Sequence, residues 1–342
     1  MNDRPPSIVN NAEAGPGWQW IRPQLSGSEA QDWRFVSALK RGPIETRLPF
    51  PHLGRVRAGF EVRRALAERP ADLLLSHGPH LAFYTASTLG AAARAARHCA
   101  LSFNFTDLPG VALRRLMIRA FRAIDRFAVY SRMEIGLYSG LFEIPEDRFD
   151  FVRWGVAPPI AEAGPRPIAK PYFVALGGEA RDYATLAETA RSMPSTRFVF
   201  IVRPHSLEGL TLPGNVTVHV NLPHHEAWSL VQHAEASLVP LRSARTPNGH
   251  VTIVGAMHLG KAQVVTDSSG VSDYVAHEKT ALLVPPGDPV AFRRAIERLR
   301  DDAELAPRLG AAAQIFAQTH CSEQVTIDYF HRLVRSGKPV RG

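Results

Sequence analysis

Residues 246–261 have an order of residue types that could bind an anion. A buried strand is predicted at 236–240, the chain turns at Gly249, and a helix follows over 249–259. The first turn of a helix has unpaired backbone N–H groups and the positive end of the helix dipole, so it attracts phosphate. The same order also occurs in strand-to-helix turns that bind nothing. Other residues must therefore decide whether an anion site exists here.

Two side chains at the ends of other predicted strands could take part in such chemistry. Arg181 follows the glycine pair 177–178, and a guanidinium group keeps its charge and can hold a phosphate through two N–H groups. It could equally be a solvated helix-start residue that pairs with Asp182. His77 follows an apolar run, and an imidazole there can exchange hydrogen bonds with a substrate near neutral pH. Alternatively, His77 only caps its strand, and His80 is a rival for the same role.

The second half of the chain alternates strands with helices. Short apolar runs are predicted as strands at 172–176, 197–202, 216–220, 236–240, 262–266 and 281–284. Helices are expected from Asp182, over 226–233 and 249–259, and after Asp288 as N-cap with Pro289 in the first turn. Continuous apolar strands that alternate with helices predict an α/β fold, in which helices cover both faces of a parallel sheet.

The first half repeats this pattern less clearly. Strands are predicted at 8–9, 72–75, 100–103 and 127–130, with an Ala-rich helix at 87–97 and an arginine-rich helix at 113–127. The proline-rich stretch 156–171 lacks periodicity and is predicted to link two domains, residues 1–155 and 172–320. Open α/β sheets bind ligands at the carboxyl ends of their strands, which is where His77 and Arg181 are expected.

Composition excludes several classes of protein. The 342 residues are 45% hydrophobic and 21% charged, as in folded globular proteins of two domains. No apolar run is long enough to span a bilayer, the first residues do not resemble a signal peptide, and the two cysteines are far apart. These features predict a cytoplasmic protein. The net charge of +8 predicts anionic partners, but no basic tract is interleaved with aromatic residues, so nucleic acid is not expected.

An ordered set of short segments between residues 172 and 320 resembles glycosyltransferase family 4, whose members are retaining enzymes of the GT-B fold. The segments are Ala-Leu-Gly-Gly at 175–178, Arg-Asp-Tyr-Ala-Thr-Leu at 181–186, Leu-Pro-Gly-Asn-Val at 212–216, Val-Pro-Leu at 239–241 and Gly-His-Val-Thr at 249–252. They continue with Ala-Met-His-Leu-Gly-Lys at 256–261, Val-Val-Thr-Asp at 264–267, Gly-Val-Ser-Asp-Tyr-Val at 270–275 and Leu-Val-Pro-Pro-Gly-Asp at 283–288. The first domain matches the family only in outline.

The resemblance implies two Rossmann-like parallel-sheet domains that face a central cleft, with the end of the chain, 321–342, returning as a helix toward the first domain. It also implies that the second domain binds a nucleotide-sugar donor and that Arg181 replaces the family's phosphate-binding lysine. The further implied donor contacts are Gly178, Gly249, His250 and Thr252. His77 matches the family's histidine beside the transferred sugar and is the implied catalytic residue.

Two positions depart from the family pattern. Many members have two glutamates, seven residues apart, that contact the donor sugar and the ribose, and the matching residues here are Pro247 and Gly255. Neither has a carboxylate, so that part of the donor contact is absent or comes from elsewhere. A glycine inside a helix is unfavourable and indicates a close approach by a ligand or by another chain segment. The missing carboxylates also allow a catalytically degenerate protein.

Weaker candidates lie in the first domain. Gly15 and Gly17 flank a proline where the family has a glycine turn near the phosphates and the acceptor, although such turns are common. Asn104 follows a predicted strand and could line the acceptor side. The helix at 113–127 has an apolar stripe, expected to pack on the sheet, and five arginines that either face solvent or contact an anionic membrane.

These expectations combine into a metal-independent, retaining glycosyltransferase that moves a hexose from a UDP- or GDP-sugar to a glycan or lipid-linked acceptor. No Asp-x-Asp motif occurs, so no metal is expected, and a helix dipole and Arg181 would balance the diphosphate charge. No cofactor besides the donor is expected. The predicted setting is polysaccharide or glycoconjugate biosynthesis in the cytoplasm, with peripheral contact at the inner face of the membrane. The rivals are a scaffold that binds a glycan or a protein, and a sugar-nucleotide epimerase.

Overall fold

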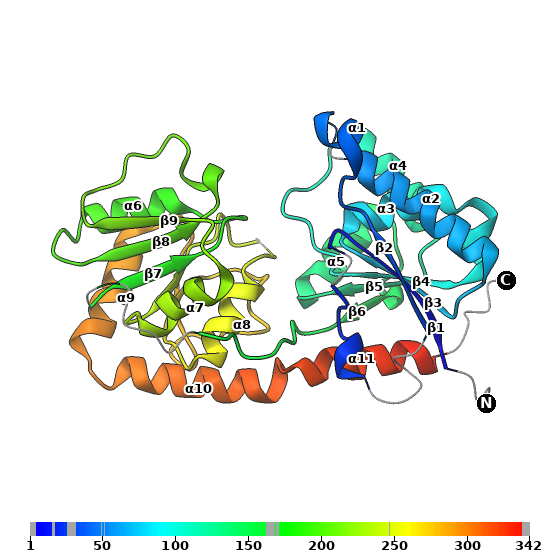
Figure 1. The fold of residues 1–342 in the computed structure, drawn as a ribbon. Helices are drawn as coiled ribbons and strands as arrows, with labels where there is room; N and C mark the ends of the chain where they lie inside the picture. Colours follow the sequence, from blue (N-terminus) through cyan, green and yellow to red (C-terminus); the bar gives the residue numbers. More distant parts are fainter. Residues whose placement is uncertain are drawn as a thin grey trace. The chain divides into compact units, whose positions relative to one another are not determined.

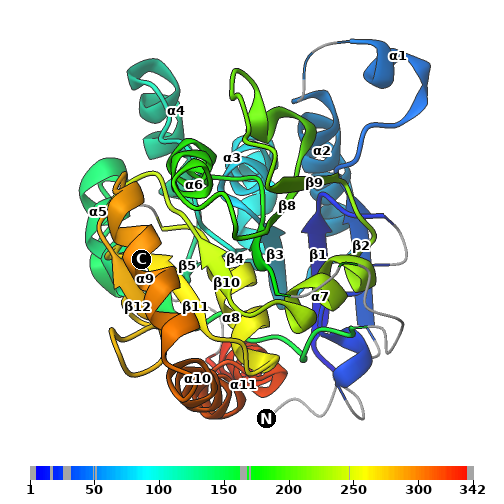
Figure 2. The same ribbon diagram turned by 90° about the vertical axis from the view of Figure 1, so that its left-hand side faces the viewer.

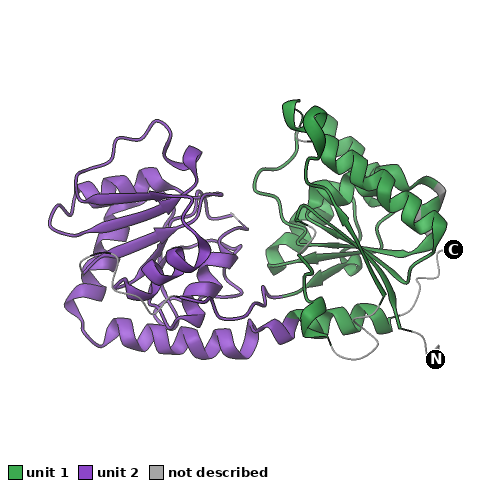
Figure 3. Cartoon of the chain, in the orientation of Figure 1, with its two compact units in different colours: residues 1–152, 326–342 green, residues 153–325 purple. Residues whose placement is uncertain are grey.

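The computed structural model describes residues 5–15, 18–25, 32–48, 50, 52–161, 168, 171–245 and 247–336. The chain forms two compact units (Figures 1 and 3). Unit 1 comprises residues 1–152 and 326–342, and unit 2 comprises residues 153–325. The last part of the chain therefore belongs to the same unit as the first part.

Unit 1 is built on a sheet of six parallel strands. The strands are β1 (Ser7–Ala12), β2 (Asp32–Ser37), β3 (Leu73–His77), β4 (Arg97–Leu101), β5 (Arg126–Val129) and β6 (Phe149–Phe151). Their spatial order is β2-β1-β3-β4-β5-β6, so the strand order reverses between β1 and β3. At such a reversal the loops after the two strands leave toward opposite faces of the sheet and open a crevice at its carboxyl edge.

Helices cover this sheet because their apolar residues recur at helical spacing. The helices of unit 1 are α1 (Gly42–Arg47), α2 (Leu53–Glu68), α3 (Pro79–Leu89), α4 (Val111–Phe121), α5 (Arg132–Phe142) and most of α11 (Glu323–Arg335). Along α2, the residues Ala58, Val62 and Leu66 lie four apart and are all buried, in one cluster with Val9 and Leu74 of the sheet. Helices α3, α4 and α5 contribute to a second cluster, which includes Phe103.

Unit 2 repeats the design with a second sheet of six parallel strands. The strands are β7 (Phe173–Leu176), β8 (Phe198–Val202), β9 (Val216–Val220), β10 (Ser237–Val239), β11 (Gln263–Thr266) and β12 (Leu282–Val284). Their order is β12-β11-β10-β7-β8-β9, so the reversal lies between β7 and β10. The two sheets differ in topology, because only β2 lies beyond the first strand β1 in unit 1, whereas β8 and β9 both lie beyond the first strand β7 in unit 2.

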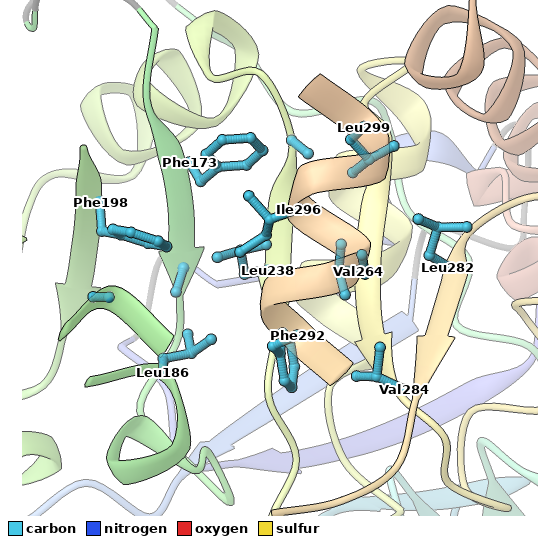
Figure 4. Close-up of a cluster of buried hydrophobic side chains, with 14 of the residues drawn as sticks. Phe173, Leu186, Phe198, Leu238, Val264, Leu282, Val284, Phe292, Ile296 and Leu299 are labelled. Atoms are coloured by element: carbon cyan, nitrogen blue, oxygen red, sulfur yellow. The ribbon is translucent and has the colours of Figure 1, made fainter. Parts of the chain in front are cut away.

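The helices of unit 2 lie on both faces of its sheet (Figures 1 and 2). They are α6 (Tyr183–Arg191), α7 (His224–His233), α8 (His250–His258), α9 (Pro289–Asp301) and α10 (Leu305–His320). Side chains of α6 and α9 share one buried cluster with the sheet, whereas those of α7 and α8 belong to clusters on the other face. In the first cluster, Phe292 and Ile296 of α9 lie over Leu238 and Val264 (Figure 4).

The structure confirms the predicted strands of unit 2, each within one residue at either end. It also confirms Asp288 as the N-cap of α9, since its carboxylate accepts a hydrogen bond from the Ala291 N–H (2.8 Å). In unit 1 the predicted helix at 87–97 differs in bounds and type: α3 ends at Leu89, because Gly90 adopts φ +53, and a 3-10 helix follows over Gly90–Ala95. The predicted strand at 100–103 corresponds to β4, which begins earlier, at Arg97. The prediction missed this start because the first two residues, Arg97 and His98, are polar although they are buried.

The region predicted as a linker is described only in part. Of residues 156–171, those at 162–167 and 169–170 lie outside the described residues. Before them, the Trp154 N–H donates to the Tyr274 hydroxyl (2.9 Å) and the Val156 N–H donates to the Cys321 carbonyl (3.0 Å). Residues 153–156 are therefore held by unit 2.

Helix α11 connects the end of the chain to unit 1. Phe330 is fully buried, and its ring lies 5.5 Å from that of Trp33 and 6.1 Å from that of Trp20. The hydroxyl of Tyr329 donates to the Asp150 carboxylate (2.9 Å), which also pairs with Arg126 at the start of β5. One ion pair of unit 1 is thus completed by the last helix of the chain.

Candidate functional site

The loops after β7 and β10 meet at the carboxyl edge of the unit 2 sheet. The Asp182 N–H donates to the Pro240 carbonyl (3.1 Å), and the Arg242 N–H donates to the Ala180 carbonyl (3.2 Å). These bonds join the two loops at the place where the strand order reverses. Ligands of open α/β sheets bind at such a place, so the side chains of these loops are the first candidates for a site.

Arg181 lies between the two loops, with 9% of its surface exposed. Its Nη2 group donates to Thr252 Oγ1 on the first turn of α8 (3.0 Å), and its Nη1 group donates to the Glu179 carbonyl (3.1 Å). Its Nε is buried and has no hydrogen-bond partner among the described residues. Gly177 makes room for this group, because a Cβ at that position would lie 2.9 Å from Nη2.

The charge of Arg181 is left unbalanced by the described part of the chain. No described carboxylate is in ion-pair contact with the guanidinium group, whose hydrogen bonds go to a hydroxyl and a carbonyl. Burial lowers the pKa of Arg181, and Tyr183 and Glu179 act in the opposite direction. A guanidinium stays protonated nevertheless, and a buried charge without a partner is costly. A bound anion would remove that cost.

The amino end of α8 adds a second positive feature beside Arg181. Its N-cap is Gly249, whose φ of +107 is a conformation that favours glycine. The first helical bond runs from the Ile253 N–H to the Gly249 carbonyl (2.9 Å), so the N–H groups of Val251 and Thr252 have no partner within the helix. A helix dipole and a buried cation therefore converge at one place, and both favour an anion.

His250 contributes to this place through its backbone, while its side chain is structural. The ring Nε2 donates to the Gly270 carbonyl (2.8 Å), and the ring lies 4.8 Å from that of Tyr274. Burial lowers the pKa of His250 to about 4, although the bond to Gly270 opposes this shift. The side chain is thus a neutral tie between α8 and the loop after β11.

Gly178 makes room for another arginine. A Cβ at Gly178 would lie 2.6 Å from Cγ of Arg203, the residue directly after β8. The guanidinium of Arg203 is exposed and donates to the Asn221 side chain (3.3 Å). Sequence reasoning missed Arg203, although its position directly after a predicted strand was a usable signal. It adds a cation to the carboxyl edge that holds Arg181.

Gly255 is explained by another part of the chain. A Cβ at this position would lie 2.1 Å from Cη2 of Trp228, a buried residue of α7. Helices α7 and α8 therefore approach each other so closely that no side chain fits at Gly255. The expected close approach is made by a chain segment. Pro247 lies in the loop before α8 and provides no carboxylate.

In unit 1, His77 ends β3 at the reversal of strand order, beside β1. Its Nε2 lies 2.8 Å from Oδ1 of Asn10, an oxygen that can only accept, so Nε2 carries the proton and Nδ1 carries the lone pair. The rings of Trp18 and Trp20 lie 4.9 Å and 5.3 Å from the imidazole, both near perpendicular to it. Burial lowers the pKa of His77 to about 3, so the side chain is neutral at neutral pH.

The other candidates of unit 1 are placed as follows. Gly15 accepts a hydrogen bond from the Trp18 N–H (3.0 Å) and has open space around its Cα, whereas Gly17 lies outside the described residues. The side-chain amide of Asn104 donates to Glu134 Oε1 (2.7 Å). His80, the rival of His77, lies in α3 with its ring 5.7 Å from that of Phe105.

Glu134 was not predicted from the sequence, because an acidic residue at the start of a helix is common. It is fully buried at the carboxyl edge of the unit 1 sheet. Its carboxylate accepts hydrogen bonds from Asn104, from the Tyr138 hydroxyl (3.0 Å) and from the Ser131 N–H (2.9 Å). Burial raises the pKa of Glu134 to about 7, against the lowering effect of these bonds.

The predicted helix at 113–127 is too long, since α4 ends at Phe121 and Phe127 lies in β5, and its packing differs from the expected one at Leu116. Met117 and Phe121 are buried as expected, but Leu116 is 59% exposed, so the expectation that it packs on the sheet is wrong. It lies on the outer side of the helix, where the neighbouring Arg115 and Arg119 are also exposed.

A hollow of about 740 Å³ lies at the opposite edge of the unit 2 sheet from Arg181. Its lining includes Phe173, Arg197 and Ala262, which stand at the amino ends of β7, β8 and β11. Convergent charge and unpaired donors, rather than hollow volume, therefore identify the site.

Within the described ranges, no three His, Cys, Asp or Glu side chains are grouped as a metal site requires. In the same ranges no helix combines the length and apolar character needed to cross a membrane.

Part of the sequence is similar to known proteins. Residues 205–316 match the family model of glycosyl transferases group 1. A lipopolysaccharide core biosynthesis glycosyltransferase of Rhizobium meliloti, LpsD, is 28% identical over 197 residues, which are 55% of this chain and 56% of that protein. The match therefore spans little more than half of the relative's length.

Solved structures extend the comparison to nearly the whole chain. HepE of Anabaena, solved in complex with UDP and glucose, has a TM-score of 0.72 at 12% identity and covers 96% of this chain and 100% of its own. Sucrose-phosphate synthase of Thermosynechococcus elongatus has a TM-score of 0.69 at 17% identity and covers 96% of this chain and 88% of its own. The two Rossmann-like units and the group 1 match together support a glycosyltransferase with the GT-B fold.

Proposed function

We propose that the protein is a retaining, metal-independent glycosyltransferase that binds its nucleotide-sugar donor in unit 2. The observation that carries the proposal is the buried guanidinium of Arg181, with no described carboxylate to balance it, at the first turn of α8. A nucleoside diphosphate bound there would accept charge-assisted hydrogen bonds of about 1.5–3 kcal/mol each. The same contacts would stabilise the charge that develops on the leaving phosphate as the glycosidic bond breaks.

The comparisons favour particular substrates for this reaction. HepE was solved with UDP and with UDP-glucose, which makes a UDP-hexose the first donor to test and a GDP-hexose the second. The similarity to LpsD, a lipopolysaccharide core biosynthesis glycosyltransferase, favours a glycan or lipid-linked acceptor. Unit 1 provides the acceptor side, with His77 as the residue that hydrogen-bonds the transferred sugar or the acceptor. A neutral imidazole suits that role, because it exchanges hydrogen bonds with hydroxyl groups without adding a buried charge.

Calorimetric titration with UDP, GDP, uridine and guanosine tests the donor site. Arg181→Ala should weaken binding of the favoured nucleoside diphosphate by about tenfold or more, while the bare nucleoside binds as before. Arg191→Ala is the matched control, since it removes an exposed arginine of α6 in the same unit. If the wild-type protein binds no nucleotide at millimolar concentration, this proposal is wrong and the protein is instead a non-catalytic scaffold. If it isomerises a UDP-sugar without an acceptor, the protein is an epimerase.

We also propose that α4 contacts an anionic membrane surface, where a lipid-linked acceptor would be found. Leu108, just before α4, is 50% exposed, Val111 and Leu116 of α4 are 57% and 59% exposed, and Arg115 and Arg119 are exposed on the same helix. Exposed apolar side chains among arginines are typical of helices that lie at a lipid interface. A cytoplasmic protein at the inner face of the membrane fits this combination.

Vesicle co-sedimentation tests the membrane contact. The protein should bind phosphatidylglycerol vesicles and not phosphatidylcholine vesicles, and Leu116→Ser should reduce the bound fraction several-fold. Ile315→Ser is the matched control, because Ile315 is an equally solvent-accessible apolar residue of α10 at 65% exposure. Equal binding of both variants, or no preference for the anionic lipid, would disprove the contact.

A further inference from the structure

We infer that Trp18 is a stacking platform for a pyranose ring of the acceptor, beside His77. The inference rests on the proposed function and names the chemical class that unit 1 recognises. Trp18 lies at the carboxyl edge of the sheet, and 37% of its surface is exposed. Tryptophan is highly buried on average, whereas part of this indole is exposed beside a candidate catalytic residue.

The described residues around Trp18 hold it in place and leave part of its surface exposed. Its ring contacts His77 on one side, at 4.9 Å and 87°, and Phe35 on another, at 6.3 Å and 57°. The Trp18 N–H donates to the Gly15 carbonyl (3.0 Å), which fixes the turn that carries it. The neighbouring Trp20 is anchored differently, since its ring contacts Trp33, Phe330 and His77. Trp20 therefore supports the imidazole from within, and Trp18 borders it at the surface.

Two kinds of surface meet at this place. The indole face of Trp18 is apolar and carries the partial negative charge of a π system, which attracts weakly positive C–H groups. The imidazole of His77 donates through Nε2 to Asn10, so its Nδ1 is available to accept a hydrogen bond. A pyranose has the complementary surface: C–H groups on the face of the ring and hydroxyl donors around its rim.

The geometry therefore assigns each residue a part in recognition. The sugar ring lies on Trp18, and one of its hydroxyl groups donates to His77 Nδ1. The imidazole is partly buried against Asn10, Trp18 and Trp20, and the loss of solvation there keeps it neutral. An acyclic polyol has the same hydroxyl groups without a flat C–H face, and it should bind much more weakly. This difference separates stacking on Trp18 from hydrogen bonding alone.

Indole ¹⁵N–¹H spectra of the full chain test the inference, because the chain has five tryptophans. Glucose, galactose, mannose and N-acetylglucosamine are the probes, sorbitol is the acyclic control, and Trp18→Phe identifies the Trp18 signal. At least one sugar should shift the Trp18 signal while those of Trp154 and Trp228, both in unit 2, stay in place. If no sugar shifts the Trp18 signal up to molar concentration, or if sorbitol shifts it equally, the inference is overturned.

Variants provide the second readout, by titration with the sugar that binds most tightly. Trp18→Ala should weaken sugar binding by about tenfold, and Trp18→Phe should weaken it by less, because a smaller aromatic face remains. Phe60→Ala is the matched control, since Phe60 is an exposed aromatic residue of α2. UDP titration of the same samples tests the donor site separately. Nucleotide binding without a Trp18 effect overturns only this inference, whereas sugar binding without nucleotide binding overturns only the proposed donor site.

Discussion

Gly255 of α8 lies directly against the indole of Trp228 on α7, so that a Cβ at Gly255 would come within 2.1 Å of Cη2. Trp228 is 3% exposed, and its Nε1 donates to His224 Nε2 (2.9 Å), which fixes the ring. The position where the family resemblance implies a carboxylate is here a packing position between two helices. The absence of that carboxylate is a consequence of how α7 and α8 pack, and it does not by itself indicate a lost activity.

Adding a side chain at this position should therefore damage the fold. Gly255→Ala should lower the free energy of unfolding of unit 2 by about 1–3 kcal/mol, and Gly255→Glu by more, as measured by urea denaturation. Gly140→Ala is the control, because Gly140 lies in α5 with open space around its Cα and should be neutral or slightly stabilising. Stable folding of Gly255→Glu with improved nucleotide affinity would contradict this packing.

His77 should affect turnover and leave nucleotide affinity unchanged. His77→Ala removes the imidazole of unit 1, whereas the proposed diphosphate contacts lie in unit 2, so kcat should fall by about tenfold or more with the Kd for UDP unchanged. His77→Gln, which keeps a polar group, should retain more activity than His77→Ala. Loss of folding in both variants would show that His77 is only structural.

The same residue gives a prediction about pH. The pKa of His77 is about 3 in the folded protein and 6.5 in an unfolded chain, so the unfolded state takes up a proton first as the pH falls. The stabilising effect of the neutral imidazole is complete above pH 6.5 and is lost as the pH falls from 6.5 toward 3. Imidazole ¹⁵N shifts should show His77 neutral at pH 5, and a shift typical of imidazolium at that pH would contradict the burial.

Glu134 should make stability depend on pH in the opposite direction to His77. Its pKa is raised from 4.5 to about 7, so the folded state holds a proton that the unfolded state has already released, and stability falls as the pH rises between these values. The resulting change in the free energy of unfolding is on the order of a few kcal/mol. Denaturation curves of Glu134→Gln should lack this slope, whereas the exposed Glu143→Gln should keep it. Parallel profiles for wild type and Glu134→Gln would show that Glu134 is ionised throughout.

Tyr329 should hold the last helix on unit 1. Tyr329→Phe removes the hydroxyl that donates to Asp150. It should lower the free energy of unfolding by about 1.5–3 kcal/mol, the range for hydrogen bonds to charged groups. Amide hydrogen exchange should accelerate across α11. Thr319→Val, which removes a hydroxyl that contacts only the backbone of its own helix α10, is the control and should leave exchange in α11 unchanged. Equal exchange in both variants would mean that the aromatic contacts of Phe330 suffice.

The strands of unit 2 could be predicted from the sequence because each is a short apolar run between turn residues, and parallel strands buried on both faces have that pattern. β4 was displaced because it begins with Arg97 and His98, whose polar side chains are buried and hydrogen-bonded through contacts distant in sequence. Arg181 and Thr252 could each be named from local motifs. Their hydrogen bond could not, because it joins a loop residue to a helix residue 71 positions away in the sequence. Glu134 was missed for a similar reason, since only the folded sheet edge brings Asn104 to it.

The division of unit 1 into residues 1–152 and 326–342 has a consequence for synthesis on the ribosome. Domains generally fold as they emerge, amino-terminal first. Here the first 152 residues emerge before α11. Until α11 is synthesised, Trp20 and Trp33 lack their ring contacts with Phe330, and the Arg126–Asp150 pair lacks its hydrogen bond from Tyr329. Unit 2 lies wholly within the intervening chain and can finish folding first. The nascent protein therefore has a period in which a tryptophan-lined surface is uncovered, and a stop codon shortly before residue 323 would make that state permanent.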